Sequence, residues 1–283
     1  MEIKNIAVIG SGTMGNGIAQ VFAQYGFKVF LIDISKELLD KALSTIANNL
    51  DRMIKKGTIT EDTKQLTLNN IQPIIGVENL NHQIDLVVEA VNENFEIKKN
   101  VFQAIESKLS EHTILASNTS SIPITKLANL TSRPDKFIGM HFMNPVPVMK
   151  LVEIIRGYLT SNETFETIKD LTLKIEKVPA EVNDYPGFVS NRVLMPMINE
   201  AIYCVYEGVA TPENIDTVMK LGMNHPMGPL TLADFIGLDV CLAIMEVLYE
   251  GFNDPKYRPC PLLKKMVAAN KLGRKTGEGF FKY

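Results

Sequence analysis

The chain has 283 residues, of which 46% are hydrophobic and 22% are charged, and its formal net charge at pH 7 is −3. Its length and apolar content suffice for a buried core and for two domains. The small negative charge creates no field that would attract nucleic acid or an anionic membrane surface, so neither partner is expected. Charged residues interrupt every apolar segment before it reaches the ~20 residues needed to cross a bilayer.

The three cysteines, Cys204, Cys241 and Cys260, are widely spaced and form no C-x-x-C pair. This pattern favours neither a disulfide framework nor a zinc site, so no metal is expected. It fits a reducing compartment. The first strand pattern begins within a few residues of the start, which leaves no room for a targeting peptide, and we therefore expect a cytoplasmic location.

Strand and helix patterns alternate through the first part of the chain. Apolar runs predict strands at 3–9, 29–32, 71–75, 86–88, 114–116, 137–140 and 178–182. Helical periodicity predicts helices after the first strand and over 35–56, 95–109 and 163–176, with a shorter one starting near Thr60. Ser35 and Gly57 are suited to cap the ends of the long helix. The alternation indicates a mainly parallel sheet.

The strand pattern stops at the turn sequence 184–187, and only helical patterns follow. They cover 188–207, 212–221, 230–250 and 262–269. We therefore predict an α/β fold, with a mainly parallel sheet domain over 1–185 followed by a smaller all-α domain over 186–283. The amphipathic helices of the second domain are expected to bury one face against another subunit, which predicts a homodimer.

A glycine-rich motif stands directly between the first strand and the first helix. It consists of Gly10, Ser11, Gly12, Thr13, Met14 and Gly15. Its glycines allow a tight turn and let backbone N–H groups approach a pyrophosphate at the helix N-terminus, as in a Rossmann-type domain. Asp33 ends the second strand, where a carboxylate accepts hydrogen bonds from the ribose hydroxyls and repels a 2′-phosphate, so NAD is favoured over NADP. FAD is the rival for the same glycines, but no other flavin-binding feature is evident.

A histidine and a glutamate, His141 and Glu153, flank a proline-rich turn. A carboxylate that accepts a hydrogen bond from one imidazole nitrogen fixes the tautomer and the orientation of the ring and favours the imidazolium form. The pair is therefore a candidate proton-transfer device, suited to a hydride acceptor such as nicotinamide. The alternative interpretation is a structural ion pair.

Together with the glycine motif, five further segments resemble the 3-hydroxyacyl-CoA dehydrogenases, in the order typical of that family. They occupy residues 117–121, 141–153, 186–192, 225–229 and 273–277. The resemblance covers nearly the whole chain, and the length is similar to that of the short bacterial 3-hydroxybutyryl-CoA dehydrogenases. Met143 departs from the family, which usually has phenylalanine there; this change affects an apolar wall rather than a reacting group.

The resemblance implies NAD-dependent oxidation of L-3-hydroxyacyl-CoA to 3-ketoacyl-CoA and the reverse, on short chains such as 3-hydroxybutyryl-CoA and acetoacetyl-CoA. It makes His141 the general acid/base, oriented by Glu153. It assigns Ser120 and Asn191 to the substrate oxygen and the imidazole. The positions it places on the cofactor side, besides the glycine motif and Asp33, are Glu93, Lys98, Ser120, Asn144 and Lys275.

Coenzyme A requires contacts to its phosphates. Asn49, Arg52 and Lys56 share one face of the predicted long helix and are candidates for these contacts. The resemblance implies that Asn49 and Lys56 contact the thioester carrier. A solvated charged face explains the same spacing equally well.

Two other functions remain open from the sequence. The first is a dehydrogenase of a free hydroxy acid or sugar acid. Comparing the activity on acetoacetyl-CoA with that on free acetoacetate would distinguish this function from a 3-hydroxyacyl-CoA dehydrogenase. The second is a non-catalytic dinucleotide-binding protein. The presence of His141, Glu153, Ser120 and Asn191 argues against the second.

Overall fold

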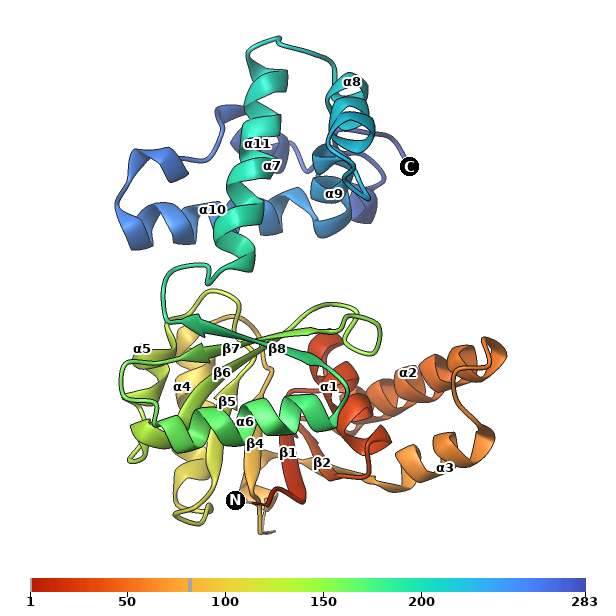
Figure 1. Ribbon diagram of the computed structural model, residues 1–283, viewed down its shortest axis with the longest axis vertical. Coiled ribbons are helices and arrows are strands. Elements are labelled where there is room, and N and C mark those ends of the chain that lie inside the picture. The colour runs from red at the N-terminus through yellow and green to blue at the C-terminus, as the bar shows by residue number, and fades with distance from the viewer. Residues whose placement is uncertain (1, 81–82) are drawn as a thin grey trace. The chain divides into compact units, whose positions relative to one another are not determined.

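The computed structural model describes residues 2–80 and 83–283. Its contacts divide the chain into two compact units, one ending at Asp184 and the other running from Tyr185 to Tyr283. We call them the sheet unit and the helical unit, and each is described by itself (Figure 1).

The sheet unit is built on one eight-stranded sheet with the order β3-β2-β1-β4-β5-β6-β7-β8. The strands are β1 (Asn5–Ile9), β2 (Lys28–Asp33), β3 (Ile71–Ile75), β4 (Leu86–Glu89), β5 (Ile114–Ser117), β6 (Phe137–Phe142), β7 (Leu151–Arg156) and β8 (Val178–Asn183). Every neighbouring pair is parallel except β6 and β7. The predicted mainly parallel sheet is confirmed. The sequence patterns did not identify β7, at which the strand direction reverses after the proline-rich turn; β8 then runs parallel to β7.

The helices of the sheet unit connect these strands. They are α1 (Thr13–Gln24), α2 (Lys36–Lys55), α3 (Glu61–Asn69), α4 (Phe95–Glu106), α5 (Ile124–Ala128) and α6 (Asn162–Lys174). Hydroxyl groups cap several of them: the Ser35 side chain accepts the Leu38 N–H at the start of α2, and Thr60 does the same for Thr63 at the start of α3. Gly57, with φ +68°, follows α2. The short helix α5 was not predicted.

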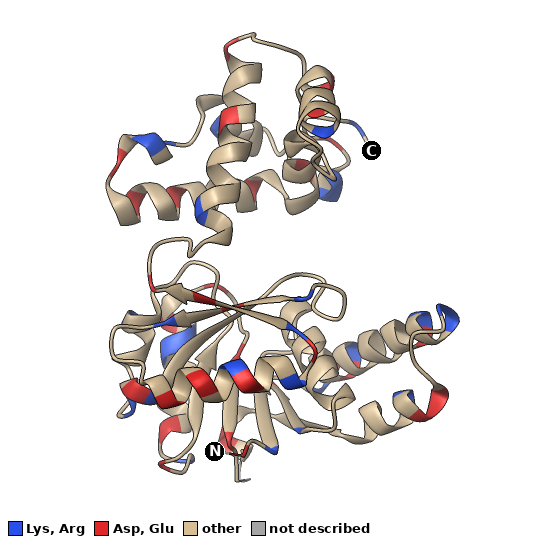
Figure 2. Ribbon diagram, in the orientation of Figure 1, with Lys and Arg blue, Asp and Glu red and all other residues tan. Residues whose placement is uncertain are grey.

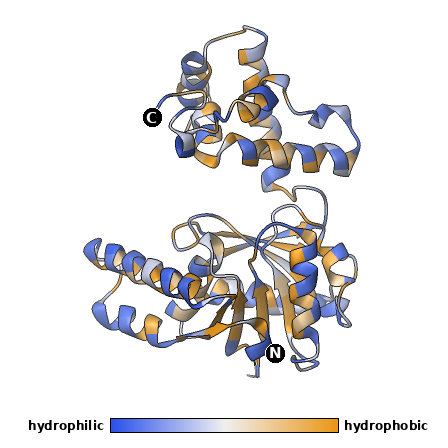
Figure 3. Cartoon of the chain, turned by 180° about the vertical axis from the view of Figure 1, so that it is seen from behind, coloured by the Kyte–Doolittle hydropathy of each residue, from blue (hydrophilic) through white to orange (hydrophobic). Residues whose placement is uncertain are grey.

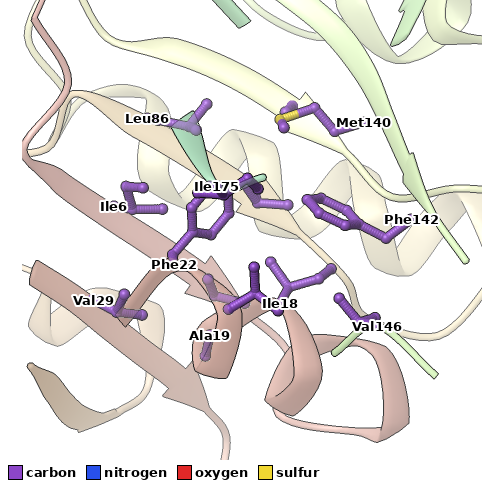
Figure 4. Close-up of a cluster of buried hydrophobic side chains, with 14 of the residues drawn as sticks. Ile6, Ile18, Ala19, Phe22, Val29, Leu86, Met140, Phe142, Val146 and Ile175 are labelled. Carbon is purple, nitrogen blue, oxygen red and sulfur yellow. The ribbon is translucent and has the colours of Figure 1, made fainter. Parts of the chain in front are cut away.

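The core of the sheet unit lies between the sheet and the helices α1, α2 and α6. Figure 4 shows Phe22 of α1 between the strands and Phe142, and the two rings meet edge to face with centroids 6.0 Å apart. On the opposite side of the sheet, Phe102 of α4 packs on Phe137 of β6. The strands are mostly apolar along their length (Figure 3), as expected for a sheet covered on both faces.

The helical unit contains five α-helices and one π-helix among its regular elements. They are α7 (Ser190–Tyr206), α8 (Pro212–Thr217), a π-helix (Val218–Gly222), α9 (Pro229–Ile236), α10 (Leu238–Phe252) and α11 (Pro261–Ala268). The single helix predicted over 230–250 is wrong, because it is two helices that meet at Gly237. Gly237 has φ +104°, a conformation that interrupts an α-helix and that side chains rarely adopt.

Charged residues of both signs lie on α2, α3 and α6, whereas the strands carry few of them (Figure 2). Within residues 2–80 and 83–283, none of the helices combines the length and the apolar character that a bilayer crossing requires. The same part of the chain contains no cluster of three or more metal-ligating side chains.

Candidate active site

The glycine motif forms a tight turn against the end of β4. Gly10 has φ +96°, and a Cβ there would meet the Ala90 carbonyl oxygen at 2.6 Å. A Cβ on Gly15 would overlap the Gly10 carbonyl, whereas the corresponding space at Gly12 is open. Close packing therefore requires glycine at positions 10 and 15. The open space at Gly12 lies at the N-terminus of α1, where a pyrophosphate is expected to bind.

Asp33 lies beside this turn. Its Oδ2 atom accepts hydrogen bonds from the Ser11 N–H at 2.7 Å and from the Ser11 hydroxyl at 2.6 Å. The end of β2 and the glycine turn are thereby fixed to each other. A carboxylate in this place is suited to ribose hydroxyls and unsuited to a phosphate, and the turn, the helix end and the carboxylate together fit a dinucleotide such as NAD.

A cavity of about 340 Å³ opens next to the glycine turn. Its lining residues come from the turn and α1 (Ser11, Gly12, Thr13, Asn16, Gly17), from α2 (Leu38, Lys41, Ala42, Thr45, Asn49) and from the proline-rich turn (Asn144, Pro145, Val146, Pro147). Asn49 lines the cavity, while Arg52 and Lys56 are exposed residues that do not line it. Lys41 and Thr45 were missed, although they precede Asn49 by eight and four residues, a spacing that places all three on the same helix face.

His141 and Glu153 lie directly opposite each other on the antiparallel strands β6 and β7. His141 Nδ1 lies 2.7 Å from Glu153 Oε2, and the two residues are 8% and 2% exposed. An ionised carboxylate can only accept, so an ionised Glu153 requires Nδ1 to be the donor of this hydrogen bond. The cross-strand register therefore creates the pair that the sequence placed on either side of a turn.

The proline-rich turn between β6 and β7 is bound by Lys177, a residue that the sequence patterns did not indicate. Lys177 is 7% exposed, and its Nζ donates to the Val146 and Met149 carbonyls at 2.8 and 2.7 Å. Val146 also packs against α1 at Gly17, where a Cβ would lie 2.9 Å from the Val146 Cβ. The turn that carries Asn144 is thus held by both Lys177 and α1.

The loop after β5, residues 118–121, is organised around Glu93. Glu93 Oε1 accepts hydrogen bonds from the Thr119 hydroxyl at 2.6 Å, from the Ser120 N–H at 2.8 Å and from the Ser121 N–H at 2.9 Å. Burial raises the pKa of Glu93, but the Lys98 charge and these hydrogen bonds outweigh it, so the pKa lies below its ordinary value. The carboxylate is therefore a charged anchor for the segment that carries Ser120.

Lys98 is buried at the start of α4 and pairs with two carboxylates. Its Nζ lies 2.7 Å from Glu89 Oε1 and 3.3 Å from Glu93 Oε2. Lys98 is 1% exposed and Glu89 is fully buried. Glu89 ends β4 and was not predicted as a site residue; its position at the carboxyl end of a central parallel strand is the signal that would have found it.

Asn191 and Lys275 belong to the helical unit. Asn191 is buried in the first turn of α7, and its N–H donates to the Gly187 carbonyl at 3.1 Å. Gly187 has φ +73°, and a Cβ there would meet Leu248 at 2.6 Å. Lys275 lies in a 3₁₀ turn (Arg274–Thr276) and forms an ion pair with Asp239. Both residues are therefore held by contacts within their own unit.

Comparison with known proteins supplies the family. Residues 5–185 match the 3-hydroxyacyl-CoA dehydrogenase, NAD binding domain, and residues 187–283 match the 3-hydroxyacyl-CoA dehydrogenase, C-terminal domain. The chain belongs to the 3-hydroxyacyl-CoA dehydrogenase family. This match confirms the predicted family, its fold, NAD as the cofactor and an NAD-dependent dehydrogenase activity.

Three similar proteins illustrate the match. A protein of Bacillus subtilis named probable 3-hydroxybutyryl-CoA dehydrogenase is 57% identical over 283 residues, covering 100% of this chain and 98% of its own. Human mitochondrial hydroxyacyl-coenzyme A dehydrogenase is 45% identical over 288 residues, covering 99% of this chain and 91% of its own. The crystal structure of (S)-3-hydroxybutyryl-CoA dehydrogenase from Ralstonia eutropha superposes with a TM-score of 0.97 at 52% identity, covering 100% of this chain and 99% of that one.

Proposed function

We propose that this dehydrogenase interconverts 3-hydroxybutyryl-CoA and acetoacetyl-CoA, with L-3-hydroxyacyl-CoA thioesters of short chain length as its substrates. The observation that carries the proposal is the buried pair of His141 and Glu153, 2.7 Å apart at the carboxyl edge of a dinucleotide-binding sheet. The printed names of the similar proteins from Bacillus subtilis and Ralstonia eutropha support the choice of substrate.

In this proposal His141 is the general acid/base. In the direction of oxidation its Nε2 takes the proton of the substrate hydroxyl, because a secondary alcohol is a poor hydride donor until that proton leaves. Glu153 accepts the Nδ1 hydrogen throughout, so the ring keeps its orientation and the imidazolium form is stabilised. In the direction of reduction His141 returns the proton. Ser120 and Asn191 hold the substrate oxygen as charge develops on it.

The glycine turn would hold the dinucleotide, and Asp33 would bind its ribose. The other residues proposed for the cofactor are Glu93, Lys98, Ser120, Asn144 and Lys275. When bound, NAD accepts or returns the hydride at its nicotinamide ring. The residues of the chain would contribute binding and orientation: the N-terminus of α1 would receive the pyrophosphate, and the Asp33 carboxylate would repel a 2′-phosphate. We expect NADPH to be a poor substitute for NADH.

Asn49 and Arg52 of α2, together with Lys56 at its C-terminal end, are proposed to bind coenzyme A. Asn49 lines the cavity, and the two cations lie further along the chain. We assign residues 1–185 to an NAD-binding domain and residues 186–283 to a domain for substrate binding and dimerisation. The proposed state is a homodimer in the cytoplasm. Light scattering at micromolar concentration tests the assembly, since a monomeric mass would contradict it.

The decisive experiment is the oxidation of NADH in the presence of acetoacetyl-CoA. We expect turnover with the thioester, far less with free acetoacetate, and a fall in kcat of about 10²- to 10⁴-fold in His141→Ala. His112→Ala is the matched control, because His112 is an exposed histidine near Asp85. Absence of turnover in the wild type, or full activity in His141→Ala, would contradict the proposed function.

A further inference from the structure

One carboxylate outside the assigned site lies at the centre of a closed hydrogen-bond network. Glu89 is fully buried at the end of β4. Its Oε1 accepts hydrogen bonds from Lys98 Nζ and from the Val91 N–H, both at 2.7 Å, and its Oε2 accepts the Ser117 hydroxyl at 2.6 Å. Both oxygens are engaged, so the orientation of the carboxylate is fixed.

The first arm of the network runs through Lys98. Its ammonium group bridges Glu89 and Glu93, at 2.7 and 3.3 Å. Glu93 in turn accepts the backbone N–H groups of Ser120 and Ser121, at 2.8 and 2.9 Å. The charge of Glu89 therefore holds Lys98 in place, and Lys98 holds the carboxylate that anchors the backbone of the loop 118–121.

The second arm runs through Ser117. Its hydroxyl donates to Glu89 Oε2 and accepts the backbone N–H of Thr119 at 3.2 Å. The Thr119 hydroxyl then donates to Glu93 at 2.6 Å, where the first arm ends. The two oxygens of Glu89 are thus linked to the loop 118–121 by two routes. Oε1 is linked through Lys98 and Glu93 to Ser120, and Oε2 is linked through Ser117 to Thr119.

Burial makes this arrangement costly. Desolvation raises the pKa of Glu89, although Lys98, Ser117 and Val91 favour its charged form. A buried ion pair is weak evidence for stability, because apolar residues of similar volume often pack as well. The energetic cost is therefore better explained by the geometry that the network imposes on the loop.

We propose that Glu89 is a positioning residue for Ser120, acting through Lys98 and Ser117 on the backbone of the loop 118–121. The inference rests on the proposed function, in which Ser120 holds the substrate oxygen. Glu89→Gln preserves the size of the side chain, but it removes the charge facing Lys98 and replaces one accepting oxygen with a donor. The loop then loses its fixed attachment.

Two measurements on the full-length protein test this inference. The first is the coupling of Glu89→Gln with Ser120→Ala. We expect Glu89→Gln to lower kcat/KM for acetoacetyl-CoA about tenfold in the wild-type background and less than about twofold in Ser120→Ala, because residues acting through one another are not additive. A purely structural role would cost the same factor in both backgrounds, and that result would overturn the inference.

The second measurement is hydrogen exchange of the Ser120 and Ser121 amides, which does not depend on activity. We expect about tenfold faster exchange in Glu89→Gln, because Glu93, which accepts these N–H groups, is then no longer held in place through Lys98. Glu106→Gln is the matched control: this partly buried glutamate contacts Ser132 and Arg133, away from the loop. Exchange in Glu89→Gln that equals the wild-type rate would overturn the inference.

The two proposals fail in different ways. If the wild type does not turn over acetoacetyl-CoA, the proposed function is wrong, but the exchange experiment still decides whether Glu89 positions the loop. If Glu89→Gln does not fold, Ser117→Ala cuts the second arm alone. Faster exchange at Ser120 in that variant supports the inference, and unchanged exchange overturns it.

Discussion

Two buried lysines, Lys98 and Lys177, hold two different loops of the proposed active site by different means. Lys98 lies between two carboxylates, Glu89 and Glu93. Lys177 donates to the carbonyls of Val146 and Met149, and no carboxylate of the described residues pairs with it. Carboxylate charges therefore neutralise the Lys98 ammonium, whereas backbone carbonyl groups accept the hydrogen bonds of the Lys177 ammonium.

This difference shows that fixing a loop does not require a buried ion pair. Around Lys98, opposite charges organise the side chains that hold the loop 118–121. Around Lys177, the cation binds the turn backbone directly, and desolvation lowers its pKa. Lys98 should therefore matter more for stability, because its removal leaves buried negative charge uncompensated.

Removing the Lys98 charge is expected to have the largest effect and tests the difference between the two lysines most directly. We expect Lys98→Met to lower the free energy of unfolding by about 3 kcal/mol, because one fully buried carboxylate and its neighbour Glu93 lose their cation. Urea denaturation measures the loss. Lys99→Met is the control, since the adjacent lysine makes only an exposed pair with Glu96. If Lys98→Met lowered the free energy of unfolding less than Lys99→Met does, the proposed role of the buried Lys98 charge would be contradicted.

The second test removes the Lys177 cation. We expect Lys177→Met to cost about 1–2 kcal/mol, because two carbonyl oxygens lose donors while the desolvation of an ammonium is relieved. NADH binding, measured by fluorescence, should weaken several-fold because the turn carrying Asn144 loosens. Lys174→Met, an exposed residue of α6, is the control. If Lys177→Met lowered the free energy of unfolding more than Lys98→Met does, the ranking of the two lysines would be wrong.

The smallest expected effect is a pH dependence specific to Lys177. Its pKa is lower in the folded protein than the ordinary 10.5, so the folded state loses this proton first as the pH rises. Between the two pKa values the unfolded chain binds more protons, and stability increases with pH. The wild type should therefore gain stability relative to Lys177→Met as the pH approaches 10.5. Thermal unfolding at a series of alkaline pH values measures this; a constant difference would contradict it.

The sequence predicted the architecture of the sheet unit because its strands are apolar runs and its helices have clear caps. It missed β7, because Leu151–Arg156 has Glu153 at a position that faces the site rather than the core. It also joined α9 and α10, because the apolar helical pattern continues through Gly237 while the backbone there does not. The periodicity of apolar residues does not reveal the backbone conformation of a single residue such as Gly237.

Motifs indicated the glycine turn, Asp33 and the pair of His141 and Glu153. Glu89 and Lys177 were missed for one physical reason: a charged residue in a sequence is usually exposed, and only the folded structure shows which ones are buried. The roles assigned to Arg52 and Lys56 remain predictions, since both residues are exposed, the first on α2 and the second directly after it.

The facing register of β6 and β7 has a consequence for protein engineering. Because His141 and Glu153 meet across a strand pair, their contact depends on the ladder and not on the length of the connecting turn. A residue inserted within β6 would turn the imidazole to the other side of the sheet, whereas one inserted near Val148, at the exposed tip, would leave the pair intact. An insertion there is therefore expected to preserve the His141–Glu153 contact, while it separates Val146 from Met149, whose carbonyls Lys177 binds.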